Sequence, residues 1–104
     1  MYLMLFDNEI KEIPKEIGNL KNLKNLVLND NPIESLPNTI GDLTNLNILN
    51  LNRTKLKSLP ESLGNLKNLK MLDIVDTPIS EEELRNLKKK LPDTRIYNGK
   101  DITL

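Results

Sequence analysis

The chain contains no cysteine and no histidine among its 104 residues. The missing cysteine excludes disulfide bonds and thiolate nucleophiles, and the missing histidine excludes imidazole bases. Together the two absences remove the usual ligands of zinc. We therefore predict no catalytic residue, no metal site and no cofactor, and we do not expect an enzyme.

Carboxylates and lysines are the groups left for acid–base chemistry. Asp73 and Asp76 could pair, but nothing in the sequence around them forms a pocket. The stretch Asn29-Asp30-Asn31 lacks the glycine and the closing glutamate of an EF-hand loop, so it does not predict a calcium site. A hydrolase that depends on Asp73 is therefore the weakest functional alternative.

Aromatic residues make up only 3% of the chain, so leucine and isoleucine have to build its core. No apolar stretch approaches the length of a membrane span. The apolar segment 1–6 is short and lacks the basic region and the cleavage site of a signal peptide. The compartment stays unknown: the cytoplasm is the default expectation, and export remains an alternative.

The chain also lacks an excess of charge of either sign, because its fifteen basic and fifteen acidic residues cancel. A neutral chain without a dense basic segment does not favour binding to nucleic acid. The run Lys88–Lys90 is interpreted as the end of a helix. We expect a protein as the partner, with a second copy of this chain as one option.

What the sequence does contain is a phrase repeated every 23 residues, which is typical of a stacked solenoid. The repeated positions are Pro14, Pro37 and Pro60; Gly18, Gly41 and Gly64; Leu20, Leu43 and Leu66; and Asn22, Asn45 and Asn68. Within each phrase, two apolar residues alternate with variable ones, as in a short strand. These pairs are Leu26/Leu28, Leu49/Leu51 and Leu72/Ile74. Identical strands one repeat apart are expected to lie side by side and parallel.

Residues 23–33, 46–56 and 69–79 each read L-x-x-L-x-L/I-x-x-N/T-x-I/L. The chain thus resembles the leucine-rich repeat family over roughly residues 3–97. The connector 33–46 is similar to the 23-residue subclass of bacterial proteins, including spirochaete ones, and of plant Ras-group-related proteins. The resemblance implies an α/β solenoid with short parallel concave strands, 3₁₀ or irregular convex segments and a C-terminal cap helix plus strand. It also implies that Ile17, Ile40 and Leu63 fill the core from the convex side.

We expect a single leucine-rich repeat domain over residues 1–104. Its parts are a partial first repeat (1–22), three repeats (23–45, 46–68 and 69–79), a C-terminal cap (80–97) and a tail (98–104). The cap is predicted to begin with a capping box of Ser80 and Glu83, with Leu84, Leu87 and Leu91 on its apolar face. Residues 94–97 are predicted to form a last strand, after which the tail either forms a short edge strand or frays.

In this family the asparagine of the pattern forms a buried ladder that satisfies backbone groups of the turn. The resemblance places Asn8, Asn31, Thr54 and Thr77 in this structural ladder. Threonine has one hydroxyl hydrogen where asparagine has two amide hydrogens. We therefore expect looser or water-assisted turns at Thr54 and Thr77.

The chain begins in mid-repeat, and its first strand is expected to expose an apolar edge. Two explanations stay open. The chain is a C-terminal fragment of a longer repeat protein, or it covers this edge with a partner or with a second copy as a homodimer.

The variable strand positions are expected to form the binding face for a protein partner. The predicted partner-binding residues are Tyr2, Met4, Phe6, Val27, Ile48, Met71, Asp73 and Val75. Isolated exposed apolar residues are also normal on a protein surface, which is the structural alternative. For Asp30, Arg53 and Asp76 we favour a surface ion-pair ladder over a recognition role. Four strands make a face only about 15–20 Å wide, so a tight complex would also need the edges or a dimer.

Overall fold

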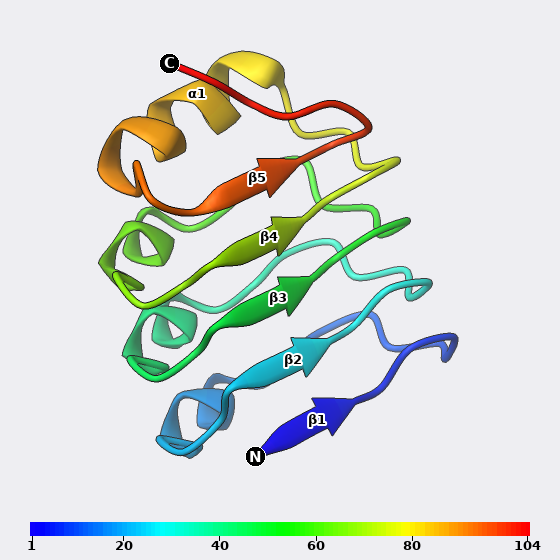
Figure 1. Ribbon diagram of the computed structural model, residues 1–104. Coiled ribbons are helices and arrows are strands. Elements are labelled where there is room, and N and C mark those ends of the chain that lie inside the picture. Colours follow the sequence, from blue (N-terminus) through cyan, green and yellow to red (C-terminus); the bar gives the residue numbers. More distant parts are fainter.

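Five short strands lie side by side in one parallel sheet, in a computed structural model that describes all residues 1–104 (Figure 1). The order of the strands in the sheet is the order in the chain. The strands are β1 (Tyr2–Met4), β2 (Asn25–Val27), β3 (Ile48–Asn50), β4 (Met71–Asp73) and β5 (Arg95–Tyr97). The expectation of a parallel solenoid is confirmed.

The register follows the repeat. Leu3 pairs with Leu26, Leu26 with Leu49 and Leu49 with Leu72, each 23 residues further on. Leu72 then pairs with Ile96, which is 24 residues further on. Because the central residue of every strand faces inward, its two neighbours face outward on one common sheet face.

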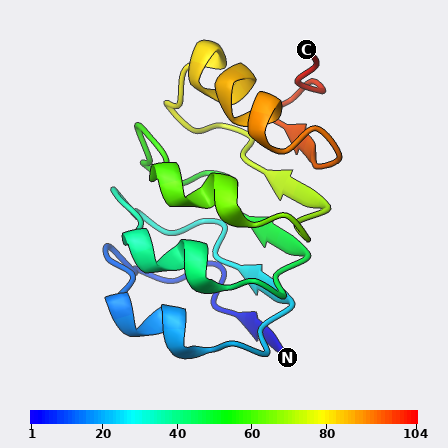
Figure 2. The same cartoon turned by 90° about the vertical axis from the view of Figure 1, so that its left-hand side faces the viewer.

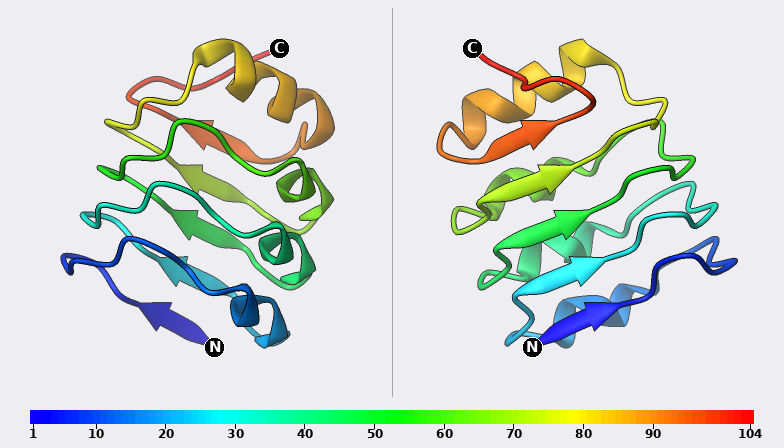
Figure 3. Two further views of the ribbon diagram at one scale, coloured as in Figure 1. Left: turned by 180° about the vertical axis from the view of Figure 1, so that it is seen from behind. Right: turned by 45° about the vertical axis from the view of Figure 1, so that its right-hand side comes forward.

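Three 3₁₀ helices of five residues each cover the opposite side of the core (Figures 2 and 3). They are η1 (Lys15–Asn19), η2 (Asn38–Asp42) and η3 (Glu61–Asn65). Each begins directly after a proline, whose carbonyl oxygen accepts a hydrogen bond from the backbone N–H three residues later at 3.0–3.1 Å. Proline fixes φ near its helical value and has no N–H that would need a partner there. The turn can therefore start at proline without the loss of a hydrogen bond.

Gly41 lies where η2 packs on η3. A Cβ at this position would come within 2.6 Å of the backbone oxygen of Ser62 and 2.7 Å of its Cβ. The glycine therefore allows a close approach of the two backbones, which the Ser62 hydroxyl also uses when it donates to the Asn38 carbonyl at 2.6 Å. This explains the glycine at position 41 of the connector.

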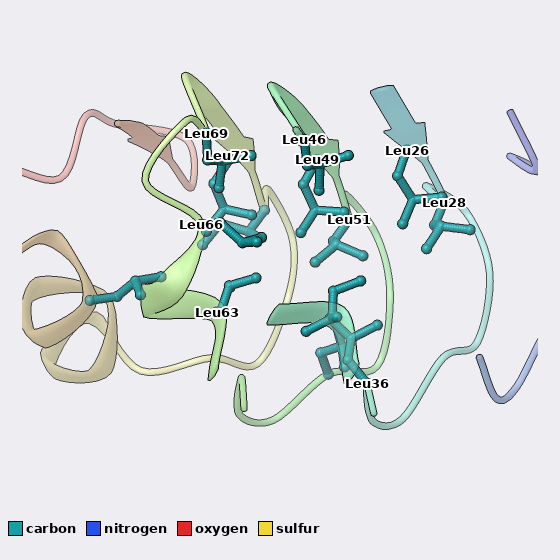
Figure 4. Close-up of a cluster of buried hydrophobic side chains, with 14 of the residues drawn as sticks. Leu26, Leu28, Leu36, Leu46, Leu49, Leu51, Leu63, Leu66, Leu69 and Leu72 are labelled. Atoms are coloured by element: carbon teal, nitrogen blue, oxygen red, sulfur yellow. The ribbon is translucent and has the colours of Figure 1, made fainter. Parts of the chain in front are cut away.

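The core lies between the sheet and the 3₁₀ helices and is entirely aliphatic (Figure 4). Leucines from the strands, such as Leu49 and Leu72, meet Leu63 from η3 and Leu66 just after it, and all four are fully buried. Ile17 and Ile40 are also buried on the helical side, as predicted. Equivalent side chains stack from one repeat to the next, which is how a solenoid forms a core without aromatic residues.

The C-terminal end is covered by helix α1 (Glu81–Lys90), which packs beside η3 (Figure 1). Its N-cap is Ser80, whose hydroxyl accepts from the Glu83 N–H at 3.2 Å. The predicted reciprocal half of the capping box is wrong, because the Glu83 carboxylate accepts from the Leu59 N–H at 2.6 Å instead. Leu84, Leu87 and Leu91 are buried as predicted.

The tail neither forms an edge strand nor frays. It turns back at Gly99, forms one isolated antiparallel bridge between Tyr97 and Asp101, and buries the Ile102 side chain. The Ile102 N–H donates to the Ile96 carbonyl at 2.9 Å. The buried Ile102 side chain, together with these backbone contacts, holds the tail against the last strand.

The opposite end exposes the first strand. Leu3 and Leu5 are only half-buried, whereas their counterparts Leu26 and Leu28 are fully buried. Met1, Tyr2, Met4 and Phe6 are each more than half exposed. The expected apolar edge is therefore present at β1.

Candidate functional site

The outward-facing residues of the five strands form two columns across the sheet, and we call this surface the sheet face. One column starts from Tyr2 on β1 and the other from Met4, two residues further on. In sheet order the first contains Tyr2, Asn25, Ile48, Met71 and Arg95, and the second contains Met4, Val27, Asn50, Asp73 and Tyr97. Side chains on neighbouring strands of such a column are close enough to contact the same partner group.

The predicted apolar residues gather in two places on the sheet face. At β1, Tyr2, Met4 and Phe6 are exposed, and Val27 follows Met4 in its column. Further along, Ile48 and Met71 are direct neighbours on β3 and β4. Val75 follows β4 and is half-buried, as are Met71 and Asp73. Asn25 lies between Tyr2 and Ile48 and separates the two groups within the first column.

Sequence reasoning missed Arg95 and Tyr97, which extend both columns onto β5. The Arg95 guanidinium lies 5.0 Å from the centroid of the Tyr97 ring and pairs with the Asp101 carboxylate at 2.6 Å. The hydrogen bond from Arg95 lowers the pKa of Asp101. Alternation within the predicted strand 94–97 was a sufficient signal, because it puts Arg95 and Tyr97 on the face that carries Met71 and Asp73.

The turns that follow the strands contain four residues with positive φ: Asp7, Asp30, Arg53 and Asp76, at φ values between 55 and 62°. Aspartate tolerates this conformation better than arginine does. Arg53 nevertheless occupies it and forms two hydrogen bonds to the Asp30 carboxylate, at 2.6 and 2.9 Å. Asp76 forms no ion pair, so the expected ladder of three charges is reduced to one pair.

The Asp30 carboxylate is stabilised in its charged form. Hydrogen bonds from Arg53 and from the Asn29 amide lower the pKa of Asp30 to about 2. The same contact raises the pKa of Arg53. The Asp30 and Arg53 charges thus pair with each other, and a partner that binds either group would have to compete with this ion pair.

The Asn31 side chain is buried and takes part in five hydrogen bonds. Its amide donates to the carbonyls of Leu5, Leu28 and Asn29, and its oxygen accepts from the N–H groups of Asn8 and Ile10. At the exposed edge, the side-chain amide of Asn8 donates only to carbonyls of its own turn.

Thr54 and Thr77, at the equivalent positions, each donate once, to the carbonyl three residues earlier. All four turns nevertheless have a residue with positive φ at the equivalent position, so a looser turn at the threonines stays a prediction. 

The chain brings together no group of three or more acidic residues that could hold a metal ion. No helix reaches the length and apolar character that crossing a membrane requires. 

Comparison with known proteins identifies relatives of this architecture. A family model described as a leucine-rich repeat region matches residues 1–96. A leucine-rich repeat protein of Leptospira interrogans is 41% identical, with a TM-score of 0.89 over 92% of this chain and 24% of its own. An internalin (InlF) of Listeria monocytogenes shares the fold at 24% identity, with a TM-score of 0.80 over 99% of this chain and 30% of its own. The chain thus spans less than a third of either protein, and no curated protein sequence matches it.

Proposed function

This chain belongs to the leucine-rich repeat family, and on that premise we propose that it is a non-enzymatic module that binds another protein through the sheet face. Proteins of this fold are typically interaction modules. The observation that carries the proposal is the apolar pair of the exposed Ile48 and the half-buried Met71 on adjacent strands, beside Arg95 and Tyr97 on β5.

The composition of this region supports a protein partner. Tyrosine, arginine and methionine are enriched at the centres of protein interfaces, where they combine large contact area with few rotatable bonds or with several hydrogen-bond donors. Asp73 lies beside Tyr97 and adds a carboxylate to the same patch. The neighbouring amides of Asn50 and Asn52 already accept hydrogen bonds from the backbone, at 3.0 and 2.6 Å, so they form a fixed polar margin.

The width of the sheet face limits the area that a partner can bury on it. Five strands give it a width of about 19 Å, which lies within the range of about 15–20 Å expected from four strands. Stable complexes bury about 800 Å² on each partner. A short extended or helical segment of a partner therefore fits this face better than a whole domain does.

Selection of displayed random peptides against the purified chain tests the proposal. Selected peptides should lose binding to the variant Ile48→Glu/Met71→Glu and keep it with Lys55→Glu/Lys57→Glu, which changes two exposed lysines of the turn side. Peptides that bind both variants as well as the parent chain would refute the sheet face as the binding surface.

Self-association through β1 is the second candidate function. The Leu5 N–H donates to Val27 of β2 and the Asp7 N–H donates to Asn29 just after β2, both at 2.9 Å. Because backbone groups alternate along a strand, the N–H and C=O groups of Met4 point away from the sheet. A second copy could pair with this free edge and bury the half-exposed Leu3 and Leu5. In a longer protein, preceding repeats would cover the same edge.

A further inference from the structure

The positive charge of this neutral chain gathers along one side of the solenoid. Four stacked segments lead from a helix toward the next strand on this side: residues 20–24, 43–47, 66–70 and 88–94 (Figures 1 and 2). They contain seven of the fifteen basic residues and only one of the fifteen acidic ones, Asp93. Lys89 and Lys90 face other sides, because Lys89 lines a hollow with Glu82 and Arg85 and the Lys90 side chain lies against Gly64. We call this side the lysine flank, and its basic members are Lys21, Lys24, Lys67, Lys70 and Lys88.

Part of this charge has a structural role. The Lys21 ammonium donates to the Asp42 carbonyl at 3.5 Å, and the Lys67 ammonium donates to the Lys90 carbonyl at 2.9 Å. Lys88 donates to the carbonyls of Pro92 and Thr94. These bonds satisfy carbonyl groups at the ends of helices, where cations are favourable.

Lys24 and Lys70 have no such role. Their ammonium groups have no hydrogen-bond partner in the protein, and none of the four salt bridges of the molecule includes a lysine of this flank. The single acid of the flank, Asp93, forms no ion pair either. Positive charge is therefore in excess along the flank, where Asp93 is the one carboxylate.

Between these lysines lies an open hollow of about 660 Å³. Asp93 lines this hollow together with Lys24, Lys67 and Lys70. The lining also contains the Asn45 and Asn68 amides, whose nitrogens donate to the Lys21 and Thr44 carbonyls at 2.8 and 2.9 Å. Their side-chain oxygens have no protein donor. Asn47 lies between Lys24 and Lys70 in the stack, and its side chain makes no hydrogen bond to the protein.

We propose that the lysine flank binds an acidic peptide segment, as a second interaction surface separate from the sheet face. Lys24 and Lys70 belong to alternate repeats, so their backbones are about 10 Å apart. A run of aspartate or glutamate can supply a carboxylate to each, and charge complementarity of this kind favours association and orientation. The proposal does not depend on the sheet face.

The free amide oxygens distinguish a peptide from a nucleic acid. A peptide backbone offers N–H donors to Asn45 and Asn68 while its side chains reach the lysines. A DNA backbone offers phosphate acceptors only. The chain as a whole also has a pI of about 6.3, unlike the strongly basic domains that bind nucleic acid.

Binding of a fluorescein-labelled octaglutamate, followed by fluorescence anisotropy, tests the proposal. Charge reversal in Lys24→Glu/Lys70→Glu should weaken binding by at least about tenfold, and raising the salt from about 50 to about 300 mM should weaken it as well. The matched control Lys55→Glu/Lys57→Glu, with the same change of net charge on the other side, should bind within about twofold of the parent chain. Circular dichroism verifies that both variants are folded.

Two further measurements make the outcome decisive. In ¹H–¹⁵N spectra, octaglutamate should shift the side-chain amide signal of Asn47 and the backbone signals around Lys24 and Lys70. Equal loss of binding in the two variants, or shifts confined to the sheet face, would overturn the proposal. Tighter binding of a single-stranded octathymidylate than of octaglutamate would overturn the choice of an acidic peptide. Because Ile48 and Met71 are unchanged in these variants, failure here leaves the sheet-face proposal untouched.

Discussion

The Glu83 carboxylate of the cap helix accepts a hydrogen bond from the backbone N–H of Leu59, at 2.6 Å. The residues are 24 positions apart, and the bond joins the helical cap to the preceding repeat. Leu59 is partly buried, so its N–H would be costly to leave unpaired.

Replacing Glu83 by alanine should therefore loosen the cap. We expect a loss of about 1–3 kcal/mol in the free energy of unfolding and faster hydrogen exchange of the Leu59 amide. Glu82→Ala is the matched control, because Glu82 lies in the same first turn but is exposed and makes no hydrogen bond. Equal exchange of the Leu59 amide in both variants would contradict the assigned contact.

The glycines of the repeat should differ in their tolerance of a methyl group. Gly41→Ala places Cβ against the Ser62 backbone and should destabilise the protein by about 1–3 kcal/mol. Gly64→Ala meets the Lys90 side chain at 2.8 Å, and this flexible chain can move aside, so the change should be nearly neutral. Urea unfolding of the two variants makes the comparison, and equal costs would show that backbone approach does not select the glycine.

Asn31 should contribute more to stability than Thr54 does. Asn31→Ala removes a side chain with five hydrogen bonds, whereas Thr54→Ala removes one with a single bond. Unpaired buried groups cost about 1–3 kcal/mol each, so Asn31→Ala should lower the melting temperature clearly more. The ladder role would be refuted if Asn31→Ala melted at the temperature of the parent chain.

The pairing of Asp30 with Arg53 makes a pH-dependent contribution to the free energy of unfolding. The folded pKa of Asp30, about 2, lies below its ordinary value of 3.8, so the stabilisation is complete above about pH 4 and is lost as the pH falls through 2. In Arg53→Asn, which suits the positive φ of 55°, the Asp30 pKa should rise toward its ordinary value. A carboxyl ¹³C titration measures this shift, and an unchanged midpoint would exclude Arg53 as its cause.

Self-association through β1 should depend on the outward backbone of the first strand. Met4→Pro removes an N–H that points away from β2, and Phe6→Lys places a charge on the same edge. If the chain dimerises, each change should convert the dimer to a monomer in light scattering coupled to size exclusion. The control is Ile48→Lys on the sheet face, which should leave the mass unchanged. A parent chain that is monomeric at high concentration would rule out this function.

Much of the fold could be predicted because each repeat packs on a copy of itself. Leu26, Leu49 and Leu72 occupy the same place in successive turns, so one period in the sequence defines both the strand and its register. The family resemblance implied 3₁₀ or irregular segments on the convex side, and each 3₁₀ helix starts directly after the repeated proline. The eight predicted residues of the binding face lie on or directly after strands, but their role as a site stays a prediction.

The contacts that could not be predicted join segments that are not equivalent. Glu83 was expected to cap its own helix, yet it reaches Leu59, and no period relates the cap to a repeat. Ile102 enters the core from a tail that has no counterpart elsewhere in the chain. The hydrogen bonds and ion pairs of such residues depend on which side chains the fold brings into contact, and the repeat period does not specify these contacts.

The sequence by itself determined the solenoid, its strand order, its aliphatic core and its exposed first strand, because stacking of identical units leaves one arrangement that buries every leucine. Only the tertiary structure decided which charges pair. Arg53 pairs with Asp30 and leaves Asp76 without an ion pair, Arg95 pairs with Asp101, and Lys24 and Lys70 stay unpaired on one flank. The physical reason is that charge pairing acts through distance in space, and stacking brings residues from separate repeats to within reach of one partner.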